Sequence, residues 1–216
     1  TGEWAGLPGQ DLLAQARSGL MWLTGDGDGP PMPMGLAVAD QLAGNITVQG
    51  ILAALLERHS TGVGAHVETS LLEALIDFQF EVLTTHFNDP QRRLPERSEV
   101  SNAHAYLAAP YGVYRTADGY LAIAMMPVPR LAEVLGCAAI AGETDPRQWF
   151  TQRDSIKARL AEFLATETTA HWVSLLIPAD IWATEVLDWT QLLASPGFKD
   201  LDFTQTLTLG SGEAIE

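Results

Sequence analysis

The longest helix-forming stretch, from Asp40 to His59, constrains the fold of this chain more than any other feature. Apolar residues lie on nearly every side of the expected helix, which predicts that the helix is buried. Arg58 and His59 supply cations in its last turn, and Gly62 and Gly64 follow as residues that tolerate a left-handed conformation. The other elements must therefore pack around one long helix.

The residues before this helix predict a shorter helix and a loop. Asp11–Leu23 has apolar residues at helical spacing, which Gly19 interrupts or ends. Thr24–Gly35, with the sequence TGDGDGPPMPMG, is rich in residues that cannot continue a helix.

The residues after the long helix predict a strand followed by another helix. Ala65–Thr69 alternates apolar and polar residues like a short strand. Ser70 and Glu73 have the spacing of a capping box, with Ser70 as N-cap, and open a helix that is expected to run to about Thr85.

The second half of the chain has a mixed pattern. Asn88–Ser101 is charged, contains proline and lacks periodicity, as expected for a linker or a crossing between domains. Tyr111–Arg115 and Tyr120–Met125 flank an Asp-Gly turn and predict a β-hairpin. The remaining predicted elements are helices at Val128–Leu135, Ser155–Ala165 and Ala170–Ile177 and a strand at Ile181–Val186, before a tail, Gly197–Glu216, with little pattern.

These elements predict an α/β fold with a mainly helical part and a small mixed part. The expected units are a helical part at 1–87, a crossing linker at 88–105, a small α/β domain at 106–190 and a return segment at 191–216.

Composition excludes several classes of function. The net charge of −15 argues against binding to nucleic acid or to an anionic membrane. The single cysteine, Cys137, allows no internal disulfide and no multi-cysteine metal site, and we expect no metal. No apolar run is long enough for a membrane span and no secretion signal is recognised, so we expect a cytoplasmic protein.

Several segments together resemble the family III CoA-transferases, which include formyl-CoA transferase and carnitine CoA-transferase. The resemblance begins with DLLAQARSGLM, TG followed by DGPP, and the pattern that places Gly35, Asp40 and Gly44. It continues with LAALLERHSTGVGAHVETSLLEA and, in the second half, with Tyr114–Gly119 and Ile177–Val186. It spans roughly residues 5–190. Family members are nearly twice as long, so the chain is expected to be part of that fold without the Rossmann-like segment that holds much of the CoA site.

The resemblance implies that Asp40 is the catalytic nucleophile. Such enzymes move CoA from an acyl-CoA thioester to a carboxylic acid through an aspartyl anhydride and an aspartyl-CoA thioester, with CoA as substrate and no permanently bound cofactor. A carboxylate at a helix N-terminus is favoured in its ionised form, which this chemistry requires. The alternative from spacing alone is that Asp40 is the N-cap of the long helix.

The resemblance also suggests residues along the bound substrate. The loop that ends in Gln10 and Asp11 aligns with a loop along CoA, although Asp11 could instead cap its own helix. Gln15 lies on the same helix face as Asp11 and could reach the acyl group, or could be structural.

Two alternative functions remain open. Acyl-CoA racemases share this fold, but the positions of their proton-exchanging histidine and glutamate are occupied here by Gln10 and Met126, which cannot exchange a proton. The resemblance also implies an interlocked homodimer, and a chain without the missing segments could be a truncated, non-catalytic remnant or an oligomerisation scaffold.

Overall fold

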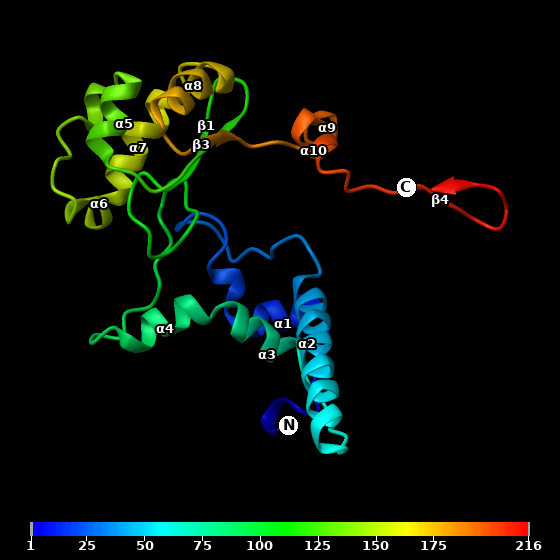
Figure 1. The fold of residues 1–216 in the computed structure, drawn as a ribbon. Coiled ribbons are helices and arrows are strands. Elements are labelled where there is room, and N and C mark those ends of the chain that lie inside the picture. The colour runs from blue at the N-terminus through cyan, green and yellow to red at the C-terminus, as the bar shows by residue number, and fades with distance from the viewer. Residues whose placement is uncertain (1, 216) are drawn as a thin grey trace.

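The computed structural model describes residues 2–215, and its first half is a group of helices. These are η1 (Gly2–Trp4), α1 (Asp11–Ser18), η2 (Leu20–Trp22), α2 (Val38–Thr61), α3 (Leu71–Phe78) and α4 (Phe80–Asn88). Gly19 has φ 84° and ends α1, as its position in the sequence predicted. Figure 1 shows α1, α3 and the first turns of α2 close together in the lower part of the molecule.

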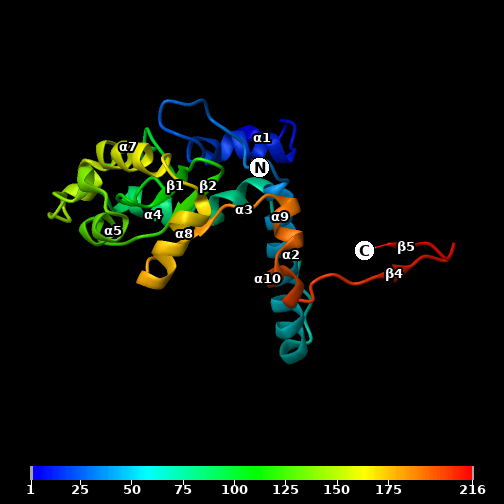
Figure 2. The same cartoon turned by 90° about the horizontal axis from the view of Figure 1, so that it is seen from above.

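The long helix is present, but the prediction that it is buried was wrong. Only Val38, Ala39 and Ala43 of α2 are buried, whereas its later turns expose large apolar side chains: Val48, Ile51, Leu52, Leu55 and Leu56. The apolar pattern predicted a helix correctly but could not specify which neighbours cover each side. Figure 2 shows α2 extending beyond the helices that hold its start.

The strand predicted at Ala65–Thr69 was also wrong, because these residues pair with no other strand in the described chain. They run beside α2 instead, where the Thr69 hydroxyl is 2.9 Å from that of Thr47. A Cβ atom on Gly50 would lie 2.7 Å from a Val67 methyl group. Among residues 65–69 only Val67 is partly buried, so the segment lies along a helix and belongs to no sheet of the described chain.

The helix after this segment begins as predicted. The Ser70 side chain accepts a hydrogen bond from the Glu73 N–H and so acts as N-cap of α3. The expected single helix is interrupted at Gln79 and continues as α4 to Asn88.

The described residues 89–111 form no helix or strand and lead to a small sheet. Strands β1 (Gly112–Arg115) and β2 (Tyr120–Ile123) form the predicted antiparallel hairpin, and β3 (Ala183–Glu185) pairs with β2 in place of the longer strand expected there.

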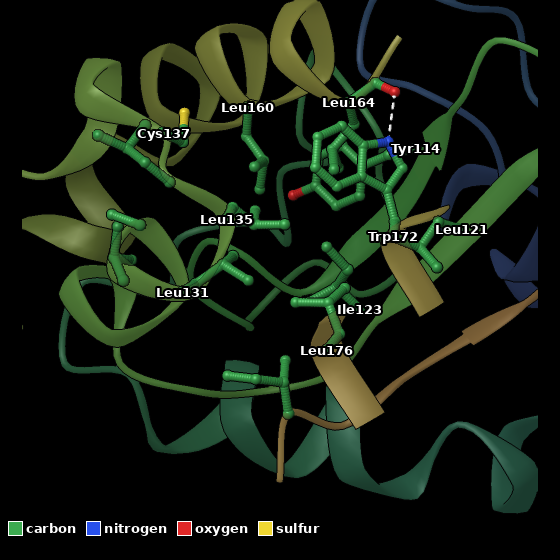
Figure 3. Packing of buried hydrophobic residues seen from close by; sticks show 14 of the residues in the cluster. Tyr114, Leu121, Ile123, Leu131, Leu135, Cys137, Leu160, Leu164, Trp172 and Leu176 are labelled. Atoms are coloured by element: carbon green, nitrogen blue, oxygen red, sulfur yellow. Dashed lines mark hydrogen bonds between the residues drawn. The ribbon is translucent and has the colours of Figure 1, made fainter. Parts of the chain in front are cut away.

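Helices cover one face of this sheet and form the larger hydrophobic core. They are α5 (Val128–Leu135), η3 (Ala138–Ile140), α6 (Gln148–Thr151), α7 (Arg153–Leu164), α8 (Thr169–Leu176) and η4 (Ile177–Ala179). Tyr114 and Leu121 of the sheet and Leu160 and Leu176 of the helices are completely buried. Figure 3 shows these side chains pointing toward one another, with the Trp172 indole donating to the Leu164 carbonyl oxygen at 2.8 Å. A second, smaller cluster joins α1, η2, α2 and α3 through Ala14, Leu20, Val38, Ala39 and Leu75.

The last segment contains short elements that the sequence did not suggest. These are α9 (Trp189–Ala194), α10 (Pro196–Asp200) and the two-residue strands β4 (Leu207–Thr208) and β5 (Ala214–Ile215). Asp188 and Gln191 form a capping box at the start of α9. Glu216, the end of the predicted tail, lies outside the described residues.

The mixed fold of helices and small sheets agrees with the predicted α/β class. Figure 1 shows the helices α1–α4 on one side and the sheet with α5–α8 on the other, connected by extended segments. Among the helices described, none is both long and apolar enough to cross a membrane.

Candidate active site at the start of helix α2

The start of α2 is the candidate active site, and Asp40 occupies its third residue. The helix begins at Val38 with Ala37 as N-cap, so Asp40 is not the N-cap that spacing alone allowed. Val38 and Ala39 are buried while the Asp40 side chain is exposed. The first turn is thus fixed in the smaller core, while the Asp40 carboxylate lies at the surface of the described chain.

Asp11 caps this helix from another element. It is the first residue of α1, and one of its carboxylate oxygens accepts hydrogen bonds from the N–H groups of Ala39 at 2.7 Å and Asp40 at 3.4 Å. Asp11 is 9% exposed. It therefore satisfies donors at the N-terminus of α2, which would otherwise lack partners, and places negative charge against the positive end of the helix.

Gln15 extends this network to the loop before α2. Its side-chain nitrogen donates to the second Asp11 oxygen at 2.7 Å and to the Leu36 carbonyl oxygen at 3.1 Å. Its side-chain oxygen accepts from the Met34 N–H at 3.1 Å. Gln15 is 1% exposed, so these bonds are shielded from water and fix the chain on both sides of Gly35, which has φ 75°.

Gln10 differs from its two neighbours in the network. It is the N-cap of α1, makes no side-chain capping bond and is exposed. A cavity of 450 Å³ lies beside the loop that leads into α1, between this loop and the start of α3. Pro8, Gly9 and Arg17 are among its lining residues.

Three of the predicted site residues lie together, and Gln10 lies outside their hydrogen-bond network. Asp11, Gln15 and Asp40 are brought together, but the first two contact backbone around Asp40 and are buried. Asp11 does not cap its own helix. Met126, at the position where the racemases have their glutamate, lies between β2 and α5. It is partly buried and packs against the larger core.

The sequence indicated that Asp11 and Gln15 share a helix face, but not that they bond the backbone at the start of α2 and the loop before it. Their acceptor and donor partners are backbone groups between 19 and 29 residues away, and backbone groups carry no sequence signal. Sequence reasoning also missed the polar residues of the crossing, including Arg97 and Asn102, which hold the loop leading to α2.

Gly44, which the family pattern places after Asp40, is exposed on α2. A Cβ atom there would meet no atom of the described residues within 4 Å, so packing within this part of the chain does not require glycine at this position.

With this geometry described, comparison with known proteins defines the class. The family model for CoA-transferase family III matches residues 1–216. The chain therefore belongs to CoA-transferase family III.

Individual relatives are consistent with this assignment. The chain is 36% identical over 175 residues to a succinate–glutarate CoA-transferase of Agrobacterium fabrum, covering 78% of this chain and 41% of that protein. It is 31% identical to an acetyl-CoA:oxalate CoA-transferase of Acetobacter aceti, covering 87% of this chain and 49% of the relative. The chain thus spans about half the length of these relatives.

Solved structures show the same fold. A crystal structure of Rv3272 from Mycobacterium tuberculosis superposes with a TM-score of 0.76 at 25% identity, covering all of this chain and 57% of the other. A CaiB/BaiF family protein from Brucella suis gives a TM-score of 0.75 at 24% identity, covering 96% of this chain and 55% of that chain.

Proposed function

We propose that the protein containing this chain transfers CoA between an acyl-CoA thioester and a carboxylic acid, with Asp40 as the nucleophile. The observation that carries this proposal is the contrast at the start of α2. The backbone N–H of Asp40 donates to the buried Asp11, which is held in turn by Gln15, while the Asp40 side chain is exposed. A nucleophile needs both properties, because it must be accessible and held in one orientation.

The proposed reaction proceeds in balanced steps. The Asp40 carboxylate attacks the thioester carbonyl, the C–S bond breaks, and a mixed anhydride and CoA thiolate form. The thiolate then attacks the Asp40 carbonyl carbon of the anhydride, which gives an aspartyl-CoA thioester and releases the first acid as its carboxylate. A second carboxylate attacks this thioester, and the same steps in reverse deliver the new acyl-CoA and free Asp40.

Asp11 and Gln15 serve this proposal as positioning residues. Their side chains bond each other and backbone groups within residues 34–40, so in this proposal they hold the nucleophile in place and do not bind the acyl group. This proposal takes the structural alternative for Gln15 and gives Asp11 a positioning role in place of the expected contact with CoA. Gln10 is retained as a proposed CoA contact because it is exposed at the loop beside the cavity.

The organisation and setting of the protein are proposed from weaker support. Two separate hydrophobic clusters support domains at residues 1–87 and 106–190, joined by 88–105 and followed by a return segment at 191–216. The exposed apolar side of α2 supports a homodimer, and a chain with a single, buried cysteine, Cys137, suits a reducing compartment such as the cytoplasm.

Covalent trapping tests the role of Asp40. The purified protein is incubated with succinyl-CoA or acetyl-CoA, treated with borohydride, and digested for mass spectrometry. Reduction of an aspartyl-CoA thioester converts the aspartate into homoserine, and we expect this change on the peptide containing Asp40. Asp40→Ala should abolish the change, while Asp77→Ala, at an exposed aspartate of α3, should retain it.

Transfer is then measured with oxalate, succinate and glutarate as acceptors, which the names of the relatives suggest. Modification that persists in Asp40→Ala, or transfer that this variant retains, would refute the assignment of the nucleophile.

A further inference from the structure

The loop between α1 and α2 is held mainly by residues of the crossing, the segment at 88–105 that connects the two parts of the chain. The Arg97 guanidinium donates to three of its carbonyl oxygens, those of Thr24 and Gly29 at 2.6 Å and that of Pro30 at 3.4 Å. Arg97 is 9% exposed, so its charge is paired with peptide dipoles within the protein.

Asn102 makes a second set of contacts with the same loop. Its side-chain nitrogen donates to the carbonyl oxygens of Leu23 at 3.4 Å and Gly25 at 2.9 Å. Its N–H donates to the Asp26 carboxylate at 2.7 Å, and its side-chain oxygen accepts from the Ser98 N–H.

The two backbones also contact each other directly. The Gly27 N–H donates to the Ser98 carbonyl oxygen at 2.8 Å. A Cβ atom on Gly27 would lie 2.8 Å from the Arg97 carbonyl oxygen. The loop and the crossing are therefore too close for independent movement.

Helix α7 holds the opposite side of the crossing. The buried Arg153 donates to the carbonyl oxygens of Glu96 and Ala105, both at 2.6 Å. The fully buried Lys157 donates to the Ser101 carbonyl oxygen at 3.3 Å. The Asp154 carboxylate accepts from the Ser98 hydroxyl at 2.5 Å and from the Glu99 N–H at 3.0 Å.

All three cations of this arrangement donate to backbone carbonyl oxygens. Six carbonyl groups, three from the loop and three from the crossing, accept from Arg97, Arg153 and Lys157. A displaced carbonyl leaves a buried cation with fewer partners, which is costly. The loop, the crossing and α7 are therefore expected to keep or lose their arrangement together.

From this connected set we propose that Arg97 and Arg153 are positioning residues that couple helix α7 to the loop leading into Asp40. A shift of α7 displaces the crossing, which displaces residues 24–30. These residues lead directly to Met34 and Leu36, which Gln15 holds beside the start of α2. The catalytic consequence rests on the proposed role of Asp40, whereas the mechanical coupling does not.

Hydrogen–deuterium exchange tests the coupling on the intact protein. We expect Arg153→Met to raise exchange about tenfold or more in peptides covering residues 24–40, although the side-chain hydrogen bonds of Arg153 go to Glu96 and Ala105. Arg97→Met should give the same pattern. Matched controls are Glu162→Ala, at an exposed residue of α7, and Arg93→Met, in the crossing, whose side chain bonds Asp89; neither should change residues 24–40.

If Arg153→Met does not fold, Asp154→Ala gives the same test, because it removes the acceptor of Ser98 and Glu99 at a partly exposed position. An exchange increase confined to α7 and the crossing, with residues 24–40 unchanged, would overturn the coupling.

Kinetics separate this proposal from the proposed function. We expect Arg97→Met to lower kcat for CoA transfer at least tenfold with little change in KM for the acyl-CoA, and Arg97→Lys to restore part of the loss. If the variants show the predicted increase in exchange but the wild-type protein transfers no CoA, the proposed function is refuted and the coupling stands. A wild-type protein that transfers CoA, with variants that leave exchange at 24–40 unchanged, would refute the coupling alone.

Discussion

Replacing Asp11 by alanine should destabilise the protein through a helix that Asp11 does not belong to. The substitution removes the acceptor of the Ala39 N–H and one partner of the buried Gln15 side chain. It also removes a negative charge from the N-terminus of α2. Losing an N-cap costs about 0.5–2 kcal/mol, and the loss of the charge at a helix end adds about 0.3–1 kcal/mol.

We therefore expect Asp11→Ala to lower the free energy of unfolding by about 2–3 kcal/mol, since an unsatisfied buried donor adds to the loss of the cap. With a urea dependence of roughly 2 kcal/mol per molar, the midpoint of urea unfolding should fall by about 1–1.5 M. Circular dichroism and hydrogen exchange of residues 34–43 should report this loss together.

Asparagine at the same position separates shape from charge. Asp11→Asn keeps one oxygen for Ala39, but its new NH₂ group faces the Gln15 NH₂ group. Gln15 cannot flip without breaking its bonds with Met34 and Leu36. We expect a loss of about 1–2 kcal/mol, since the cap remains while two donors oppose each other.

Asp77→Asn on the exposed side of α3 is the matched control and should have little effect. An Asp11→Ala protein that unfolds at the wild-type urea concentration would refute the idea that Asp11 holds the start of α2.

Three further predictions concern other parts of the molecule. Burial, together with the nearby positive charge of Arg153, lowers the pKa of Lys157 from 10.5 to about 8, although the Asp154 and Asp26 carboxylates oppose this shift. Between pH 8 and pH 10.5 the unfolded chain therefore holds a proton on Lys157 that the folded protein has lost. The unfolding free energy of wild type, measured relative to Lys157→Met, should rise over this range by up to about 3 kcal/mol. Urea unfolding at several pH values that shows no such rise would contradict this prediction. Burial raises the pKa of the Cys137 thiol, so a maleimide should label it only after denaturation, and rapid labelling of the native protein would count against the packing. Gly27→Ala should lower the free energy of unfolding by about 1–3 kcal/mol, because the new Cβ would lie too close to the Arg97 carbonyl oxygen. Gly44→Ala, whose Cβ has open space, should raise it by about 0.5–1 kcal/mol. Equal effects of the two substitutions in thermal or urea unfolding would contradict this prediction.

Local signals explain what could be predicted from the sequence. The Asp-Gly turn and its flanking residues predicted the hairpin, and Ser70 marked the start of α3, because each depends on residues only a few positions apart. The family pattern pointed to Asp40 and its helix. The start of that helix was displaced by two residues, because its true N-cap, Ala37, has no capping side chain.

The errors arise where structure depends on distant partners. Alternation at Ala65–Thr69 is compatible with any extended segment, and only a neighbouring strand would have made it a sheet. Arg97 lies in a charged, proline-containing stretch that is typical of exposed linkers, and its acceptors are carbonyl groups about 70 residues earlier in the chain. The apolar residues of α2 indicated burial but not which surface would cover them.

The position of Asp40 near one end of a long helix makes α2 a lever with the proposed nucleophile beside its pivot. The 24 residues of α2 span about 36 Å, and only the first turns are anchored by buried side chains. A tilt of about 5° about the anchored end would move the far end by about 3 Å but Asp40 by only about 0.4 Å. Movement at the exposed apolar end of α2 is therefore attenuated roughly eightfold before it reaches Asp40, so the proposed nucleophile keeps its place.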